Sequence, residues 1–504
     1  MARDRRGNVL FVTIDQLSAR ALTGPLAGAV PLPAFDRLAA TGTRFDNHFT
    51  VTLPCGPARA SLLTGLYAMN HRAIRNGTPL ARHHATVATE ARKAGYEPLL
   101  FGYSDITPDP EGMDPEDPDL ASYEGVAPGF RELVEMRLDD GLEWPGHLRA
   151  RGHVFALDGE GPVPEIYRPV APGNEPPRPS DPALYSAEDS DTAYLTDRTL
   201  AALDIRRGKP WFAHVTYIRP HPPLVAPAPW NRLVDPAALP AADRRRPDHP
   251  FLDAWFSAPS NRGLFWGFDG DCAGLSDAQV AELRAVYLGL TAEVDHHLGR
   301  LLDWLEATGQ ADDTLVIVTA DHGEMLGDKA MWGKESVFDP AFAVPLWIRD
   351  PEGGRAGHAV AALTESIDIA PTILDWIGRA PPDAMDGASL LPLARGEVPA
   401  GWRDAVFLEA DFGNPRSPTR IQRALGLTEL QSGVAILRES RWKYVHFGGN
   451  VPPMLFDLAD DPGETCDLGR DPAQAKTRAR LMAKLIDRMC ERRDRRQTGI
   501  LIGA

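Results

Sequence analysis

Four apolar runs alternate with amphipathic stretches along the larger, N-terminal part of the chain. The runs span residues 8–15, 96–105, 210–221 and 314–324. Because they show no alternation of apolar and polar positions, they predict strands buried on both faces, as in a parallel sheet. Apolar positions with a helical period predict helices over residues 33–41, 58–66, 87–94, 191–206 and 277–308. This order predicts a doubly wound α/β fold around a mostly parallel central sheet.

Two irregular segments and a change of pattern divide the chain further. Residues 107–182 and 220–276 are irregular, and long segments of this kind are usually lids, binding loops or oligomer contacts. After a predicted helix over residues 364–378, short runs at 405–410, 432–440 and 441–448 predict an antiparallel sheet, followed by a helix over 473–493. We therefore predict a large α/β domain over residues 1–385 and a smaller α+β domain over residues 386–504.

Polar residues that suit a metal site follow two of the predicted strands. Asp15 and Gln16 end the first run, and Asp321 and His322 follow the last. In open α/β sheets, sites form outside the carboxyl ends of the strands, so these donors predict a divalent-metal site. The alternative is that the two acids only cap turns. His322 favours Mn²⁺ over Ca²⁺, because calcium prefers oxygen ligands.

Cys55 lies in the stretch TLPCGPARASLLTGL, where a helix is expected to begin. Pro57 suits the first helical position, because its missing N–H is not needed there. A cysteine just before a helix N-terminus would have a lowered thiol pKa and would suit an anionic ligand. The alternative is a buried, inert cysteine.

The overall charge restricts the possible partners. The chain has 504 residues, 43% of them hydrophobic, and a formal net charge of −17, with a pI near 5.3. This balance argues against a general nucleic-acid binder. An anionic substrate would need a local positive pocket, for which Arg59, His221 and Lys334 are candidates, although each alone is equally typical of a solvated or structural residue.

The cysteines and the apolar segments indicate in which cellular compartment the protein is expected. The four cysteines lack CxxC spacing, which fits neither a zinc site nor a disulfide scaffold and favours a reducing compartment. The N-terminal apolar run is too short for a signal peptide, and no run has the length of a transmembrane helix. We expect a cytoplasmic protein that does not bind membranes.

Six motifs together resemble one enzyme family. They read NVLFVTIDQ, GTRFDNHFTVTLPCGPARASLLTGLY, YIRPHPP, VIVTADHGEMLGD, GKESVFDPAFAVPL and MLFDLADDPGETCDL. The chain resembles type I sulfatases and, among them, most the phosphonate monoester hydrolase branch of the alkaline phosphatase superfamily. The resemblance covers almost the whole chain and implies an alkaline phosphatase-like fold.

The resemblance also implies a modified residue and a metal. In this family, a formylglycine-generating enzyme oxidises the cysteine of such a motif, here Cys55, to the aldehyde formylglycine. The aldehyde hydrates to a diol; one hydroxyl attacks sulfur or phosphorus, and the other collapses the intermediate. Asp15, Gln16, Asp321 and His322, together with the modified Cys55, are implied to bind one divalent metal, which lowers the pKa of the attacking hydroxyl.

Further roles follow from the same resemblance. Arg59 is implied to orient the diol, Lys334 to hold the anionic oxygens of the substrate, and His221 to protonate the leaving oxygen. Asn76 matches an asparagine that lines the phosphonate hydrolase pocket. These assignments describe a catalytic pocket for a small anionic ester.

Tyr103 and Asp105 depart from the common sulfatase pattern, which has lysine and histidine at these positions. The phosphonate hydrolases also have tyrosine at the first position but threonine at the second. Losing a fixed positive charge favours monoanionic substrates over dianions. We expect Tyr103 to contact the substrate and Asp105 to act as the base that breaks the hemiacetal, unless Asp105 only caps its loop.

The leading functional hypothesis is a metal- and formylglycine-dependent hydrolase of aryl sulfates that also accepts phosphonate monoesters and phosphodiesters. One alternative makes phosphonate monoester or phosphodiester hydrolysis the main activity. A second is a two-metal phosphatase, and a third is a non-catalytic anion-binding protein with unmodified Cys55. The resemblance also implies a homo-oligomer, a dimer or a tetramer.

Overall fold

A large, mostly parallel sheet forms the centre of the molecule. The computed structural model describes residues 7–137, 141–156 and 163–494. In this part of the chain, the strand order of the large sheet is β5-β4-β6-β1-β7-β8-β2-β9, and only β8 runs against the others. The strands are β1 (Asn8–Ile14), β2 (Thr43–Phe45), β4 (Pro98–Gly102), β5 (Arg131–Glu135), β6 (Phe212–Tyr217), β7 (Thr314–Ala320), β8 (Leu346–Arg349) and β9 (His358–Val360). The predicted mostly parallel sheet is confirmed.

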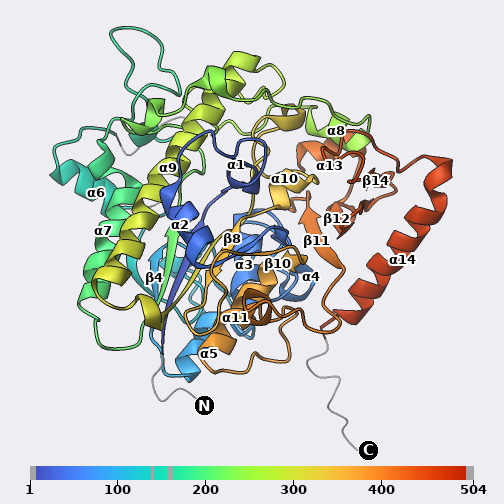
Figure 1. Cartoon of the computed structure of the whole chain (residues 1–504). Helices are drawn as coiled ribbons and strands as arrows, with labels where there is room; N and C mark the ends of the chain where they lie inside the picture. Colours follow the sequence, from blue (N-terminus) through green and yellow to red (C-terminus); the bar gives the residue numbers. More distant parts are fainter. Residues whose placement is uncertain (1–6, 138–140, 157–162, 495–504) are drawn as a thin grey trace, which may run out of the picture.

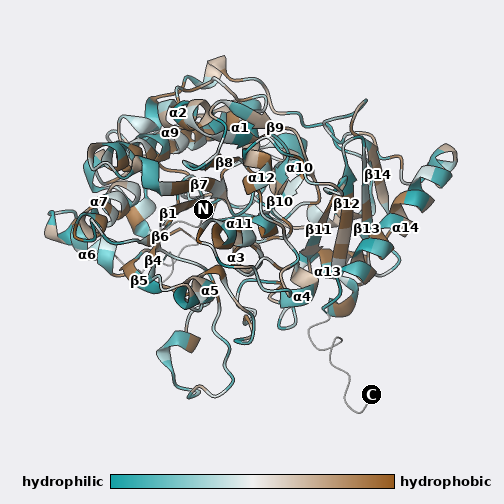
Figure 2. Ribbon diagram, turned by 60° about the horizontal axis from the view of Figure 1, so that its bottom comes forward, coloured by the Kyte–Doolittle hydropathy of each residue, from teal (hydrophilic) through white to brown (hydrophobic). Residues whose placement is uncertain are grey.

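Helices cover both faces of this sheet (Figure 2). Leu10, Val12 and Ile14 of the central strand β1 belong to one core, and Val9 and Phe11 to the other, because successive side chains of a strand point to opposite faces. The first core is covered by α2 (Pro33–Thr41), α7 (Asp191–Asp204) and α9 (Asp277–Ala307), and the second by α3 (Cys55–Thr64), α5 (Val87–Lys93) and α11 (Ile369–Trp376). The doubly wound arrangement explains why every residue of β1, β4, β6 and β7 is buried.

A second, antiparallel sheet lies beside the first (Figure 1). It consists of β11 (Ala405–Asp411), β12 (Gly433–Glu439), β13 (Trp442–Phe447) and β14 (Met454–Asp457), in that order. Leu481 and Leu485 of α14 (Ala475–Glu491) pack in one core cluster with residues of this sheet. The predicted domain boundary near residue 385 stays a prediction; α12 (Leu391–Ala394) still packs in the core of the large sheet.

The irregular segments contain more structure than the sequence pattern indicated. The first supplies β5 at the edge of the large sheet and α6 (Glu143–Ala150), and the second contains α8 (Pro250–Trp255). The helix predicted from residue 364 starts later, because β10 (Thr364–Glu365) pairs with β3 (His48–Phe49) and a 3-10 turn precedes α11. The remaining α-helices are α1 (Ala19–Leu22), α4 (Ala68–His71), α10 (Asp339–Phe342) and α13 (Arg420–Leu425).

None of the helices in the described ranges combines the length and the apolar character needed to cross a membrane.

Candidate active site

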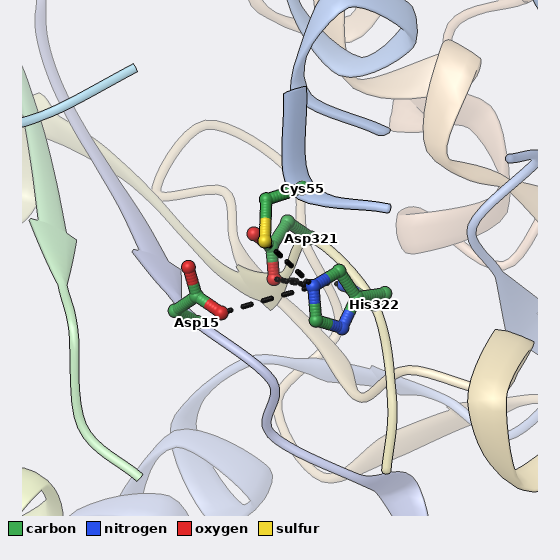
Figure 3. Close-up of side chains that lie close together, drawn as sticks. All are labelled: Asp15, Cys55, Asp321 and His322. Carbon is green, nitrogen blue, oxygen red and sulfur yellow. Dashed lines mark hydrogen bonds and ion pairs between the residues drawn. The ribbon is translucent and has the colours of Figure 1, made fainter. Parts of the chain in front are cut away.

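The carboxyl ends of β1 and β7 bring the predicted metal ligands together. Asp15 follows β1, and Asp321 and His322 follow the neighbouring strand β7. Their side chains and that of Cys55 point toward one another (Figure 3), and one ligand atom from each lies within 4.8 Å of all the others. Asp15 Oδ1 is buried and has no hydrogen-bond partner. An orphaned carboxylate oxygen among three other donors fits a bound cation, because a buried unpaired acceptor is otherwise costly.

His322 is held in the tautomer that a metal ligand needs. Its Nδ1 lies 3.0 Å from the carbonyl oxygen of Gly323, so Nδ1 donates and Nε2 keeps its lone pair. Nε2 is 3.2 Å from Cys55 Sγ. Burial, followed by the charge of Lys334, lowers the pKa of His322 to about 3, so the ring is neutral at physiological pH.

Cys55 is the first residue of α3, and not the residue just before a helix that begins at Pro57. The helix starts two residues earlier than expected and places Pro57 in its first turn, where a missing N–H is still tolerated. Gly56 is favoured by its surroundings, since an added Cβ would lie 3.0 Å from the carbonyl oxygen of Asp105 and 3.1 Å from Asn76 Oδ1, and these neighbours would have to shift. This close contact explains a glycine directly after the cysteine.

The expected lowering of the Cys55 pKa is wrong for the unmodified thiol. Burial, then the charge of Asp15, raise the pKa of Cys55 well above its ordinary value, and together they outweigh the opposing charge of Lys334. A buried thiol surrounded by carboxylates is a poor thiolate. The surroundings therefore argue against chemistry by the cysteine itself.

Arg59 binds the carboxylates of both Asp15 and Asp321. Its Nη2 donates to Asp15 Oδ2 at 3.0 Å and its Nε to Asp321 Oδ2 at 2.9 Å. Burial, then the charge of the neighbouring Asp15, raise the pKa of Asp321 to about 6, although Arg59 opposes both effects. For Asp15, burial raises the pKa, but the charges of His221, Arg59 and Lys334 together hold it well below its usual range. The positive charge of Arg59 allows two carboxylates to be buried side by side.

Lys334 lies beside Cys55, where it also contacts Gln16 and His221. Its Nζ donates to Cys55 Sγ at 2.9 Å, to Gln16 Oε1 at 3.0 Å and to His221 Nε2 at 3.1 Å. Burial would lower the pKa of Lys334, but Cys55 and Asp15 raise it above its ordinary value. The ammonium therefore stays charged beside the reactive position. Gln16 is placed with the cluster, and its role as a metal ligand stays a prediction.

Glu324 belongs to the site but escaped the sequence analysis. Its carboxylate accepts from the backbone N–H groups of Leu326 (3.0 Å) and Gly333 (2.6 Å) and from the Gln16 side-chain amide. It thus fixes the loop that carries Lys334 relative to Gln16. An acid two residues after His322, within the motif VIVTADHGEMLGD, was the available signal.

His221 follows β6 and is oriented by its own loop. Its Nδ1 donates to the carbonyl of Pro222, which leaves the lone pair of Nε2 facing Lys334. Burial, then the charge of Lys334, lower the pKa of His221 to about 4. Behind the loop, the buried Arg219 donates to the carbonyls of His221 (3.1 Å) and Pro223 (3.0 Å) and pairs with Asp191 at 2.8 Å. Sequence analysis missed Arg219, although it lies in the RPHPP motif.

Tyr103 and Asp105 follow β4 and lie behind the cluster. The Tyr103 hydroxyl donates to Asp15, and the ring lies 4.2 Å from the Arg59 guanidinium. Asp105 Oδ2 is 3.7 Å from Arg59 Nε, whereas Oδ1 is buried without a partner. Burial raises the pKa of Asp105 to about 8 although Arg59 opposes it. Substrate contact by Tyr103 and the base role of Asp105 stay predictions.

A pocket of about 340 Å³ opens on this cluster, and we call it the catalytic pocket. Its lining includes Gln16, Asn76, His221, Leu264 and Lys334. Asn76 also accepts a hydrogen bond of 2.9 Å from the Gly56 N–H, so it supports the first turn of α3. The pocket thus leads from the surface to the side of Cys55 where Lys334 and His221 meet.

Comparison with known proteins decides the family. The model of the sulfatase family matches residues 7–379. The chain belongs to the sulfatase family. A second model, for the C-terminal part of N-sulphoglucosamine sulphohydrolase, matches residues 327–491.

Three sulfatase-family relatives and neighbours match nearly the full length of the chain. A phosphonate monoester hydrolase from Silicibacter pomeroyi has 48% identity and a TM-score of 0.93, covering 98% of this chain and 97% of its own. The phosphonate monoester hydrolase of Agrobacterium radiobacter has 40% identity and a TM-score of 0.90 over the same shares. The multifunctional alkaline phosphatase superfamily protein PehA of Trinickia caryophylli is 37% identical over 93% of this chain and 92% of its own. The expected family and fold are confirmed.

Proposed function

We propose that the protein hydrolyses monoanionic esters, both sulfate monoesters and phosphonate monoesters or phosphodiesters, with Cys55 converted to formylglycine. The observation that carries the proposal is the meeting of three groups at one point. Lys334 Nζ lies 2.9 Å from Cys55 Sγ and 3.1 Å from His221 Nε2. A nucleophile position, an anion-binding group and a proton donor are thus adjacent, as ester hydrolysis requires.

One divalent metal is part of this proposal. Asp15, Asp321 and His322 would hold it, with the modified Cys55 and Gln16 completing the set. When bound, the metal supplies positive charge that activates a hydroxyl and neutralises the substrate anion. The nitrogen of His322 favours Mn²⁺ over Ca²⁺. A two-metal phosphatase would hold two ions, so we expect one metal per chain by elemental analysis.

Conversion to formylglycine explains the presence of Cys55 at this position better than catalysis by its unmodified thiol does. In its hydrated form, formylglycine offers two hydroxyls on one carbon, one to attack and one to release the product by collapse. The raised pKa of the Cys55 thiol supports this assignment over thiolate chemistry. A formylglycine-generating enzyme is the implied partner for maturation.

The remaining roles are assigned to groups of this chain. Lys334 binds the anionic oxygens of the substrate, because Arg59 is already engaged by Asp15 and Asp321. Substrate binding brings negative charge next to His221 and raises its pKa, so that Nε2 takes up a proton. His221 then donates this proton to the leaving oxygen. Arg59 keeps the carboxylates in place.

Asp105 is the proposed base for product release. Its Oδ1 is buried without a hydrogen-bond partner, so it is available to accept a proton once the carboxyl is ionised. A divalent cation next to Asp15 and Asp321 lowers the pKa of the nearby carboxyls and favours the ionised form. If Asp105 is the base, Asp105→Ala should accumulate a covalent adduct; if Asp105 only caps its loop, the variant should slow all substrates equally without an adduct.

The test is a set of parallel rates on matured, metal-loaded protein. p-Nitrophenyl sulfate, p-nitrophenyl phenylphosphonate and bis(p-nitrophenyl) phosphate share one leaving group and differ in the central atom and its second substituent. We expect turnover of the sulfate and of at least one phosphorus ester, with weaker turnover of the dianionic p-nitrophenyl phosphate. Turnover of the dianion alone would overturn the proposal and favour a phosphatase.

A further inference from the structure

A second pocket, of about 380 Å³, shares a wall with the catalytic pocket. The shared wall consists of Pro54, Lys334 and Glu335. Pro54 directly precedes Cys55, and Lys334 is the proposed anion-binding residue. A tetrahedral centre bound at Lys334 therefore stands at the junction of the two pockets.

The far side of the second pocket comes from other parts of the chain. Its lining includes Ala258, just after α8, together with Phe412 and Ile421 from the C-terminal domain. Helices α8 and α13 lie side by side there (Figure 1). Phe412 packs on Phe251 of α8 with ring centroids 5.0 Å apart. Apolar residues held by such packing give the pocket a fixed, preformed wall.

The charges around the second pocket are mostly neutralised. Arg75 pairs with Asp411 at 3.0 Å, and Arg420 pairs with Glu335 at 2.9 Å. Arg423 also lines the pocket and forms no ion pair with any residue of the described ranges. Although the whole chain carries a net charge of −17, the lining does not repel an anion.

The chemistry of the substrates requires two directions out of the reaction centre. A sulfate monoester has one organic substituent, the leaving alcohol. A phosphonate monoester or a phosphodiester has a second one on phosphorus, which stays on the product. His221, the proposed proton donor to the leaving oxygen, lines the catalytic pocket and not the second pocket. The leaving alcohol therefore occupies the catalytic pocket, and the other substituent needs separate space.

We propose that the second pocket binds the non-leaving, apolar substituent of a phosphonate monoester or phosphodiester, and thereby selects an aryl group over a methyl group on phosphorus. The proposal rests on the proposed function, because it assumes hydrolysis at Lys334 and His221. It adds a substrate class in which both sides of the phosphorus carry a bulky group.

The test fills the second pocket and compares esters with the same leaving group. Ala258 is half-buried, so Ala258→Trp places an indole in the pocket. For p-nitrophenyl phenylphosphonate relative to p-nitrophenyl methylphosphonate, we expect the ratio of kcat/KM values to fall about tenfold or more in this variant. p-Nitrophenyl sulfate, which has no second substituent, reports whether the reaction centre is intact. A ratio that does not change overturns the proposal.

A substitution in the catalytic pocket tests whether the two pockets bind different parts of the substrate. Leu264 lines the catalytic pocket, so Leu264→Ala is expected to change the discrimination between nitrophenol and larger leaving alcohols. It is expected to leave the phenyl-to-methyl ratio within about twofold of wild type, since Leu264 does not line the second pocket. If Leu264→Ala changes that ratio as much as Ala258→Trp does, the assignment of the pockets is wrong.

Two further results keep the test decisive. If Ala258→Trp does not fold, Ile421→Ala, which widens the same pocket, is expected to lower the phenyl-to-methyl ratio about threefold by loss of apolar contact. An unchanged ratio there overturns the proposal. Failure of wild-type protein to hydrolyse any of the three esters would instead overturn the proposed function, which separates the two failures.

Discussion

Lys334→Ala is the most informative single change in the active site. Lys334 is half-buried, its Nζ donates to Cys55 Sγ at 2.9 Å, and it stays charged because Cys55 and Asp15 raise its pKa. Arg59 cannot replace it, since its guanidinium is engaged by Asp15 and Asp321. The variant therefore removes the one permanent charge that the described residues direct at the substrate side of Cys55.

The expected loss follows from the position of this ammonium. A preorganised donor aimed at charge that develops in a desolvated transition state contributes about 3–4 kcal/mol. We therefore expect kcat/KM for p-nitrophenyl sulfate to fall between about 10²- and 10³-fold. Lys334→Arg keeps the positive charge but replaces the compact ammonium with a planar guanidinium, so we expect it to retain only part of the wild-type activity.

The assay needs matched material. Formylglycine content and bound metal are measured for each variant, so that a fall in rate is not a failure of maturation. Lys484→Ala serves as the control; Lys484 lies on α14, beside the antiparallel sheet, and pairs with Asp404 and Glu439, both at 2.7 Å. A loss of less than about tenfold in Lys334→Ala, with metal and formylglycine intact, would refute the assigned role.

Three further predictions concern His221, Asp105 and Glu293. His221→Asn should slow the hydrolysis of phenyl sulfate about 10- to 100-fold more than that of p-nitrophenyl sulfate, because a poor leaving group depends on the proton donor. Equal losses of rate on both esters would exclude that role. Asp105→Ala should slow product release, so that a covalent adduct accumulates in the mass spectrum of quenched enzyme; equal slowing of all substrates without an adduct would indicate a loop cap. Glu293 is buried, and burial, then Asp191, raise its pKa from 4.5 to about 8. Its contribution to stability is full below about pH 4.5 and is lost as the pH rises through 8, a difference of about 3–5 kcal/mol. Glu293→Gln should therefore flatten the fall of the urea midpoint between pH 5 and pH 9; a parallel fall in both proteins would contradict this.

The central strands and the metal cluster could be predicted because both depend on local sequence. A strand buried on both faces must be apolar throughout, so β1, β4, β6 and β7 are visible as continuous runs. The carboxyl ends of parallel strands meet at one edge of the sheet, so Asp15 and Asp321 were expected to lie together.

Other features depend on contacts that the local pattern does not record. β2 and β9 have three residues each and β8 has four, too few for a periodicity. The predicted direction of the Cys55 pKa shift was wrong because the tertiary fold buries the thiol and brings carboxylates from distant parts of the chain beside it, and both effects raise the pKa. Arg219 and Glu324 were missed because their role is to orient neighbours through backbone hydrogen bonds.

The conversion of Cys55 to formylglycine is tested most directly by the mass of the tryptic peptide covering residues 45–59, from protein co-expressed with a formylglycine-generating enzyme. We predict a peptide in which one oxygen replaces the sulfur and two hydrogens of the cysteine side chain, and turnover of the esters that rises in proportion to the converted fraction. A peptide that carries only unmodified cysteine, from protein that still hydrolyses the esters, would contradict the mechanism.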